Sequence, residues 1–292
     1  MQTPISFTSD GLRLAGILHR PDDAGGDARR PAFLVLHGFG TNKDGGTSVA
    51  VAHLLEEWGY VALRFDMRGC GDSEGEFGRV ICLEQVEDTK NALTWLATQP
   101  GVDPDRIGVV GHSFGAAVAV YAGGTDTRIA AVISSCGWGH GERKFRGQHP
   151  TPEAWKRFTD ILAEGPRHRA RTGRSLMVSR WDIVPIPEHL RGNLAAGAVM
   201  EFPAETAQSM MDFTAENVVG AIAPRPLLLL HAANDSVTPT EQSLGLFAHA
   251  RQPCDLMLFS DVDHFPFSTA STRARSAVRD WLGTYLPVRP AG

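Results

Sequence analysis

Three residues that lie far apart in the sequence have the types that nucleophilic catalysis requires: Ser113, Asp235 and His264. A serine hydroxyl is a weak nucleophile at neutral pH, so it needs a general base. That base in turn needs an acidic side chain that fixes its tautomer. We therefore predict that His264 deprotonates Ser113 for attack on a carbonyl carbon and that Asp235 orients His264.

The serine lies in the sequence GHSFG at positions 111–115, which matches the pattern Gly-x-Ser-x-Gly. A short apolar strand is predicted at 106–110, and a helix of small residues is predicted from 116 onward. A serine on a sharp turn between a strand and a helix needs small neighbours, because its backbone is strained and other chain segments pass close by. The pattern therefore predicts an exposed, activatable hydroxyl at Ser113.

Other acidic residues and histidines compete for the two supporting roles. Asp261 and Asp263 share the loop of His264, so we expect them to point to solvent or to brace that turn. His231 ends a predicted buried strand and is interpreted as a hydrogen-bonded core residue. The remaining candidates occupy the variable position of the serine motif or the inserted segment described below: His112, His140, His149, His168 and His189. The order serine, aspartate, histidine along the chain favours Asp235 and His264.

Attack on a carbonyl group creates an oxyanion, which backbone N–H groups can stabilise. One donor is predicted to be the N–H of Phe114, directly after the nucleophile. The second is predicted to be the N–H of Phe39, which follows an apolar strand and has a glycine on each side. His37 precedes this loop, and we expect it to anchor the loop by hydrogen bonds.

Strands and helices are predicted to alternate along most of the chain. Buried strands are predicted at 31–36, 61–65, 107–110, 130–134, 224–231 and 255–259, and helices at 48–58, 83–96, 241–250 and 274–286. Residues 5–7 and 12–18 flank a turn and predict an antiparallel hairpin. This alternation indicates an α/β fold with a mainly parallel central sheet and helices on both faces. Ligands bind such sheets at the carboxyl ends of the strands, where the candidate catalytic and oxyanion-binding residues fall.

Residues 137–217 break this alternation and are predicted to form an inserted, mainly helical cap. The cap separates a first core segment, 1–136, from a second, 218–292. It contains a helix-like stretch at 152–163 and a basic stretch at 167–171, which we interpret as a solvated face. Trp138, Trp155 and Trp181 are candidates to line an apolar substrate pocket, although tryptophans in a small cap are as often part of its core.

Five short motifs together resemble the α/β-hydrolase superfamily of serine hydrolases. They are HGFG at 37–40, DMRGCGDSEG at 66–75, GHSFG at 111–115, Asn234-Asp235 and Asp263-His264. The sequence is similar to feruloyl and cinnamoyl esterases, and more remotely to dipeptidyl and acylaminoacyl peptidases. The resemblance implies the α/β-hydrolase fold with the cap inserted after the sixth strand. It implies structural rather than catalytic roles for Asp66 and Arg68, in an ion pair or a turn.

Composition limits the partners of the protein. The chain has 292 residues with a net charge of −5, so no basic field favours nucleic acid or an anionic membrane. Cys70, Cys82, Cys136 and Cys254 lack zinc-ligand spacing and are expected to be free thiols. No HExxH or phosphate-loop motif occurs, so we expect no metal and no cofactor. No secretion signal or membrane-spanning run is apparent, which favours a cytoplasmic protein.

These observations predict a carboxylic ester hydrolase that works through an acyl-enzyme on Ser113. An acyltransferase, a thioesterase, an amidase or peptidase, and a carbon–carbon bond hydrolase use the same three residues and stay open, because fold does not settle function. A ligand-binding protein without activity is a further alternative. A haloalkane dehalogenase or an epoxide hydrolase would carry an aspartate at position 113. The expected partner is a small-molecule acyl substrate, and a homodimer is left open.

Overall fold

A computed structural model of the chain describes residues 1–22, 29–267 and 272–288. Within them an eight-stranded sheet runs in the order β1-β2-β4-β3-β5-β6-β9-β10. The strands are β1 (Gln2–Ser9), β2 (Leu12–His19), β3 (Arg30–Leu36), β4 (Val61–Phe65), β5 (Val102–His112), β6 (Ile129–Ser135), β9 (Leu227–Ala232) and β10 (Cys254–Phe259). The predicted strands are all present.

The first two strands form the predicted antiparallel hairpin, with Gln2 opposite His19 and Ser9 opposite Leu12. β2 is also antiparallel to β4, whereas β4, β3, β5, β6, β9 and β10 pair in parallel. The sheet is therefore mainly parallel, as predicted. The carboxyl ends of its parallel strands meet at one edge, where catalytic and binding residues collect in such folds.

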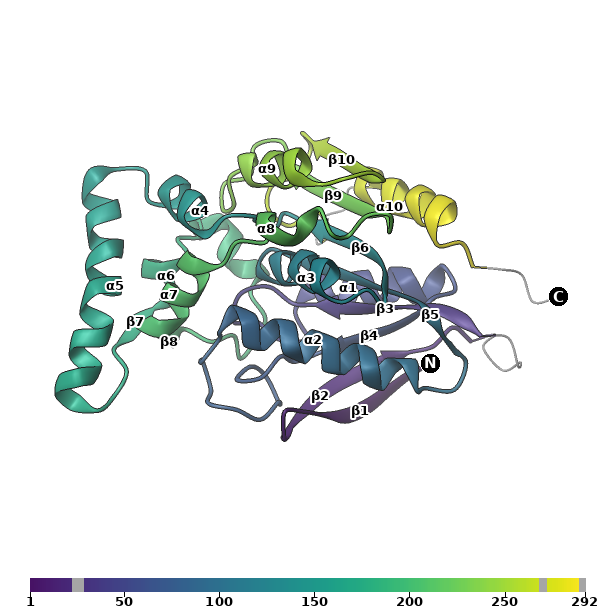
Figure 1. Ribbon diagram of the computed structural model, residues 1–292, viewed down its shortest axis with the longest axis horizontal. Coiled ribbons are helices and arrows are strands. Elements are labelled where there is room, and N and C mark those ends of the chain that lie inside the picture. The colour runs from purple at the N-terminus through teal and green to yellow at the C-terminus, as the bar shows by residue number, and fades with distance from the viewer. Residues whose placement is uncertain (23–28, 268–271, 289–292) are drawn as a thin grey trace.

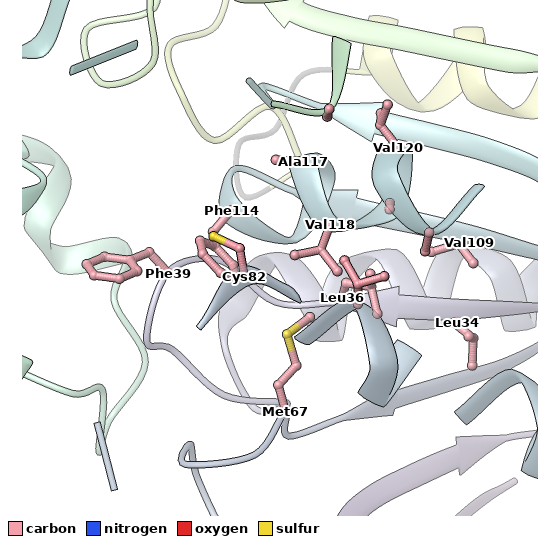
Figure 2. Packing of buried hydrophobic residues seen from close by; sticks show 14 of the residues in the cluster. Leu34, Leu36, Phe39, Met67, Cys82, Val109, Phe114, Ala117, Val118 and Val120 are labelled. Carbon is pink, nitrogen blue, oxygen red and sulfur yellow. The ribbon is translucent and has the colours of Figure 1, made fainter. Parts of the chain in front are cut away.

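Helices cover both faces of this sheet (Figure 1). On one face, Leu34 and Leu36 of β3 pack in a cluster with α2 (Cys82–Ala97) and α3 (Phe114–Thr125), part of which Figure 2 shows. On the other face, Phe33 and Val35 pack with α1 (Gly46–Glu57) and α10 (Thr272–Tyr285). Because side chains of a strand alternate between its faces, a continuous apolar strand such as β3 fills both cores.

Most of the segment between β6 and β9 forms a layer at one end of the sheet, on the left in Figure 1, whereas its last helix, α8 (Glu216–Val219), contacts α3. Before α8 the segment contains α4 (Gly141–Gln148), α5 (Pro152–Thr172), α6 (Arg180–Ile183), the 3₁₀ helix η1 (Glu188–Asn193) and α7 (Ala204–Asp212). It also holds a short antiparallel sheet of β7 (Met177–Ser179) and β8 (Glu201–Pro203), which the sequence pattern did not indicate. We call residues 137–217 the cap.

Helix α5 is longer than predicted. The pattern indicated a helix over 152–163, but the helix begins after the N-cap Thr151, includes Pro166 in its interior and ends before Gly173 at φ +72°. The predicted end was wrong because Gly165 and Pro166 usually end a helix. Here the helix continues through both residues and includes the basic stretch at 167–171. Arg169 and Arg171 on this stretch are exposed and pair with surface glutamates, as expected for a solvated face.

The second core segment adds α9 (Glu241–His249) between β9 and β10, at the predicted place. In the part of the chain that the structure describes, no helix is both long enough and apolar enough to pass through a bilayer.

Candidate active site

Ser113 lies on the turn between β5 and α3, and its backbone is in a conformation that side chains rarely adopt, with φ +55°. Two glycines make this turn feasible. A Cβ at position 111 would lie 2.1 Å from the carbonyl oxygen of Gly115, and a Cβ at position 115 would lie 2.5 Å from the carbonyl oxygen of His37. The strained turn is the feature that the Gly-x-Ser-x-Gly pattern predicted.

Ser113, His264 and Asp235 form a hydrogen-bonded chain. The Oγ of Ser113 lies 2.9 Å from Nε2 of His264. Nδ1 of His264 lies 2.8 Å from Oδ2 and 3.0 Å from Oδ1 of Asp235. Because a carboxylate can only accept, Nδ1 carries the proton and Nε2 of the neutral ring accepts from the serine hydroxyl. The structure thus brings the three predicted residues together in the tautomer that general-base chemistry needs.

Asp235 is held by several donors, and its side chain is fully buried. Its Oδ1 accepts hydrogen bonds from the N–H groups of Val237 and Thr238, at 2.8 and 2.7 Å. Burial opposes ionisation of this carboxyl, but the neighbouring His264 and His231 outweigh that effect and hold its pKa below the usual range. Asp235 is therefore ionised at neutral pH.

The competing acidic side chain Asp263 has a different role. Its carboxylate accepts from the N–H and the hydroxyl of Ser236 and from the N–H of His264. It therefore joins the two loops that carry Asp235 and His264, and it braces the turn as expected. Asp261 forms an ion pair with Arg273.

The loop after β3 lies beside the serine turn, since a Cβ at Gly38 would be 3.8 Å from the Cβ of Ser113. His37 anchors this loop: its Nε2 accepts from the N–H of Met67, so its Nδ1 carries the proton and donates to the carbonyl oxygen of Gly38 at 2.9 Å. The N–H of Phe114 belongs to the first turn of α3, where amides lack partners within the helix. The rings of Phe39 and Phe114 are buried 5.9 Å apart, which holds the two backbones close together.

The cap also fixes this loop. Phe202 of β8 stacks on Phe39 with a centroid separation of 4.2 Å. Arg180 of α6 donates from Nη2 to the carbonyl oxygens of Phe39 and Gly40, at 2.8 and 3.0 Å. Gly40 has φ +51°, and a Cβ there would lie 2.4 Å from the ring of Phe202. The predicted oxyanion loop is therefore packed directly against the cap.

A pocket that is partly open to solvent lies between Ser113 and the cap, and we call it the cavity. Its core side includes Thr41, Thr47 and Ser48. Its cap side includes Arg180, Val184, Ile186, Asn193 and Leu194. The cap lining therefore comes from α6, the proline-rich stretch after it and η1, and it is apolar with two polar side chains.

The three predicted tryptophans lie away from this cavity. Trp138 is fully buried and packs edge-on against Phe213. Trp155 and Trp181 are partly buried and lie under the guanidinium groups of Arg146 and Arg191. None of the three is among the residues that line the cavity next to Ser113. The structure places them in the packing of the cap, because apolar cap residues must cover one another as well as a substrate.

Asp66 and Arg68 have structural roles, but in separate networks rather than in one ion pair. Asp66 is fully buried and binds Lys43, with Nζ 2.9 Å from Oδ2. Arg68 binds Asp88 and Asp10, both at 2.7 Å. Both networks tie down the loop that follows β4.

Three contacts near the site were not predicted from the sequence. His231 was expected to be a hydrogen-bonded core residue, and it is: its Nδ1 lies 2.6 Å from the hydroxyl of Ser243 and its Nε2 lies 3.0 Å from the carbonyl oxygen of Thr238. The same Nε2 also lies 3.3 Å from Asp235, a contact that the i, i+4 spacing at the end of β9 could have suggested. Cys136 and Arg180 approach the site through tertiary packing that no local pattern marks.

Two clusters of potential metal ligands occur among the described residues: His19 with His53 and Glu56, and Cys136 with Asp235 and His264. Nε2 of His19 accepts from Arg64, so its Nδ1 is protonated and donates to Glu56. Burial raises the pKa of the Cys136 thiol, which is therefore protonated. Hydrogen bonds within the protein already engage the ring nitrogens of His19 and His264 in these clusters.

The sheet, the cap after β6 and the serine turn define the chain as an α/β-hydrolase of the serine hydrolase type. A family model described as X-Pro dipeptidyl-peptidase (S15 family) matches residues 10–266, and the chain belongs to this family. This is a family of hydrolase-type enzymes, and the chain is a hydrolase-type enzyme.

Similar curated proteins include the thiohydrolase aneE of Aspergillus aculeatus, which is 28% identical over 88% of this chain and 84% of its own. The polyketide transferase grgF of a Penicillium species is 27% identical over 90% of this chain and 89% of its own. Among solved structures, GrgF superimposes with a TM-score of 0.79 at 22% identity, over 98% of this chain and 99% of its own. Ferulic-acid-bound Est1E of Butyrivibrio proteoclasticus superimposes with a TM-score of 0.69 at 20% identity, over 97% and 99%. At these identities the structural likeness shows the fold.

Proposed function

We propose that the protein hydrolyses a carboxylic ester or thioester through an acyl-enzyme on Ser113. His264 removes the hydroxyl proton as Oγ attacks the carbonyl carbon, and the N–H groups of Phe39 and Phe114 bind the oxyanion. His264 then gives that proton to the leaving alcohol or thiol. Water attacks the acyl-enzyme by the same route in reverse, and the acid and the free serine are released.

One observation carries this proposal: the continuous hydrogen-bonded chain from Ser113 through His264 to the buried carboxylate of Asp235. A serine that only shaped a binding pocket would need neither a base in this tautomer nor a strained backbone at φ +55°. The thiohydrolase among its relatives supports thioesters as substrates alongside the esters that the sequence indicated.

The residues that line the cavity do not favour dipeptidyl-peptidase activity, although the family is named for it. An enzyme that removes dipeptides from a free N-terminus has to bind an ammonium group, which requires a carboxylate or several acceptors. In the part of the chain that the structure describes, the residues that line the cavity include Arg180 and no Asp or Glu. A cation beside the acyl site disfavours a positively charged substrate.

Acyl transfer is a second candidate function. The polyketide transferase grgF and the acyltransferase drtE of Aspergillus calidoustus align with 90% and 78% of this chain, so relatives of similar length are named for transfer. The chemistry differs only in the second step, where an alcohol, an amine or a carbon nucleophile takes the place of water.

The test is a substrate panel with the wild-type protein and the Ser113→Ala variant. p-Nitrophenyl esters from acetate to decanoate and the matching acyl-N-acetylcysteamine thioesters are assayed by release of phenol or thiol. We expect turnover that depends on Ser113. Analysis of the acyl product with and without added alcohol separates hydrolysis from transfer. Equal turnover by wild type and Ser113→Ala would contradict the proposal.

A further inference from the structure

Arg180 is a buried cation that lines the cavity beside Ser113. Its side chain is 1% exposed, and it enters the cavity wall from the cap helix α6. Within the described parts of the chain it forms no ion pair with a carboxylate. Taking a charge out of water is costly unless the charge is paired, so a buried guanidinium without a counter-ion requires an explanation.

Carbonyl oxygens satisfy only part of this guanidinium. Nε donates to Val199 at 2.8 Å, and Nη2 donates to Phe39 and Gly40. A guanidinium has five N–H donors, so the two on Nη1 have no acceptor among the described residues. Burial lowers the pKa of Arg180 to about 10, so the group keeps its charge at neutral pH.

The rest of the cavity wall fits an anion as well. The described lining residues include no Asp or Glu, and the hydroxyls of Thr47 and Ser48 and the second amide N–H of Asn193 are neutral groups that can donate hydrogen bonds. A guanidinium matches the geometry of a carboxylate better than that of a neutral ester or amide group.

We propose that the physiological substrate carries a carboxylate besides the reacting ester or thioester, and that Nη1 of Arg180 binds it. This inference rests on the proposed function of Ser113, and it makes Arg180 a substrate-binding residue as well as a support of the oxyanion loop. It narrows the substrate class to hemi-esters and hemi-thioesters of dicarboxylic acids, or to esters whose leaving group bears a carboxylate.

The test compares matched pairs of substrates. On the acyl side the pair is p-nitrophenyl hydrogen glutarate and its neutral methyl ester. On the leaving-group side the pair is 3-carboxyphenyl acetate and its methyl ester. We expect wild type to favour the anionic member of at least one pair by about 10- to 100-fold in kcat/KM, the size of a charge-assisted hydrogen bond.

The Arg180→Gln variant should lose that preference, whereas Arg169→Gln, on the exposed face of α5, should keep it. If Arg180 had only a structural role, the substitution would lower kcat/KM equally for both substrates of a pair. The ratio of the two kcat/KM values therefore distinguishes substrate binding from a structural role. Should Arg180→Gln fail to fold, binding of monomethyl glutarate and dimethyl glutarate to Ser113→Ala is compared by calorimetry.

Equal kcat/KM within both pairs, or equal binding of the two glutarate esters, would overturn the inference while leaving the proposed function intact. Absence of any turnover that depends on Ser113 would overturn the proposed function. The binding comparison with Ser113→Ala would still decide the role of Arg180.

Discussion

Replacing Asp235 by Asn tests how the buried acid controls His264. Oδ1 of Asp235 accepts from two backbone N–H groups, so the oxygen of an asparagine stays at that position. Its NH₂ group then occupies the place of Oδ2 and points at Nδ1 of His264, 2.8 Å away. An NH₂ group donates, so Nδ1 has to accept and the ring proton moves to Nε2.

In that tautomer His264 cannot take the proton of Ser113. We expect kcat to fall by about 10⁴-fold, which is the typical loss when the histidine of a Ser-His-Asp enzyme has the wrong tautomer. This loss corresponds to an activation barrier that is about 5 kcal/mol higher. The assay is the initial rate of p-nitrophenyl butyrate hydrolysis, with circular dichroism as the check on folding.

Asp263→Asn is the matched control, because this acid lies next to His264 in the sequence but contacts only its backbone N–H. We expect a loss of at most about 10-fold, since the hydrogen bonds of Asp263 join the two loops and none of them involves the ring of His264. The reasoning is refuted if Asp235→Asn keeps more than a tenth of wild-type activity, or if Asp263→Asn is the more damaging of the two.

Three further outcomes follow from the structure. Lys144 is buried without a hydrogen-bond acceptor among the described residues, and burial lowers its pKa to about 7. Unfolding therefore takes up a proton between about pH 7 and 10, so the Tm of the wild type should rise across that range relative to the Tm of Lys144→Met. At pH 7 the free energy of unfolding of Lys144→Met should exceed that of the wild type by about 1–3 kcal/mol. Gly40→Ala should lower the free energy of unfolding by about 1–3 kcal/mol and reduce activity, because the new Cβ would clash with Phe202. Gly192→Ala should change neither quantity, because the space around Gly192 is open. Denaturant unfolding of the two variants measures the difference. The lowered pKa of Asp235 adds stability that is complete above about pH 4 and is lost as pH falls, so Asp235→Asn should flatten the acid side of a plot of Tm against pH.

The fold could be predicted because the signals for it are local. Continuous apolar strands such as β3 and the glycines around Ser113 specify parallel pairing and a strained turn from neighbouring residues alone. The positions of Asp235 and His264 after the last two strands then follow, since parallel strands end at one edge of the sheet. These parts of the site depend on the order of elements, which the sequence displays.

The cavity wall could not be predicted, because it depends on contacts between distant segments. Arg180 meets Phe39 across a sequence separation of 141 residues, and nothing in its own segment marks it as different from the many surface arginines. Trp138 was a candidate for the pocket, yet it is buried against Phe213 instead. A residue type indicates that a side chain prefers an apolar place, but the packing of the cap decides which place that is.

The central claim is that Ser113 forms a covalent acyl-enzyme. The most direct measurement mixes the protein with a p-nitrophenyl ester, quenches in acid within the first turnover, and locates the added mass by peptide mass spectrometry. We predict an acyl group on the peptide that contains Ser113 and none on the Ser113→Ala variant. An acyl group on another residue, or turnover accompanied by no adduct at any time point and by full activity of Ser113→Ala, would contradict the account.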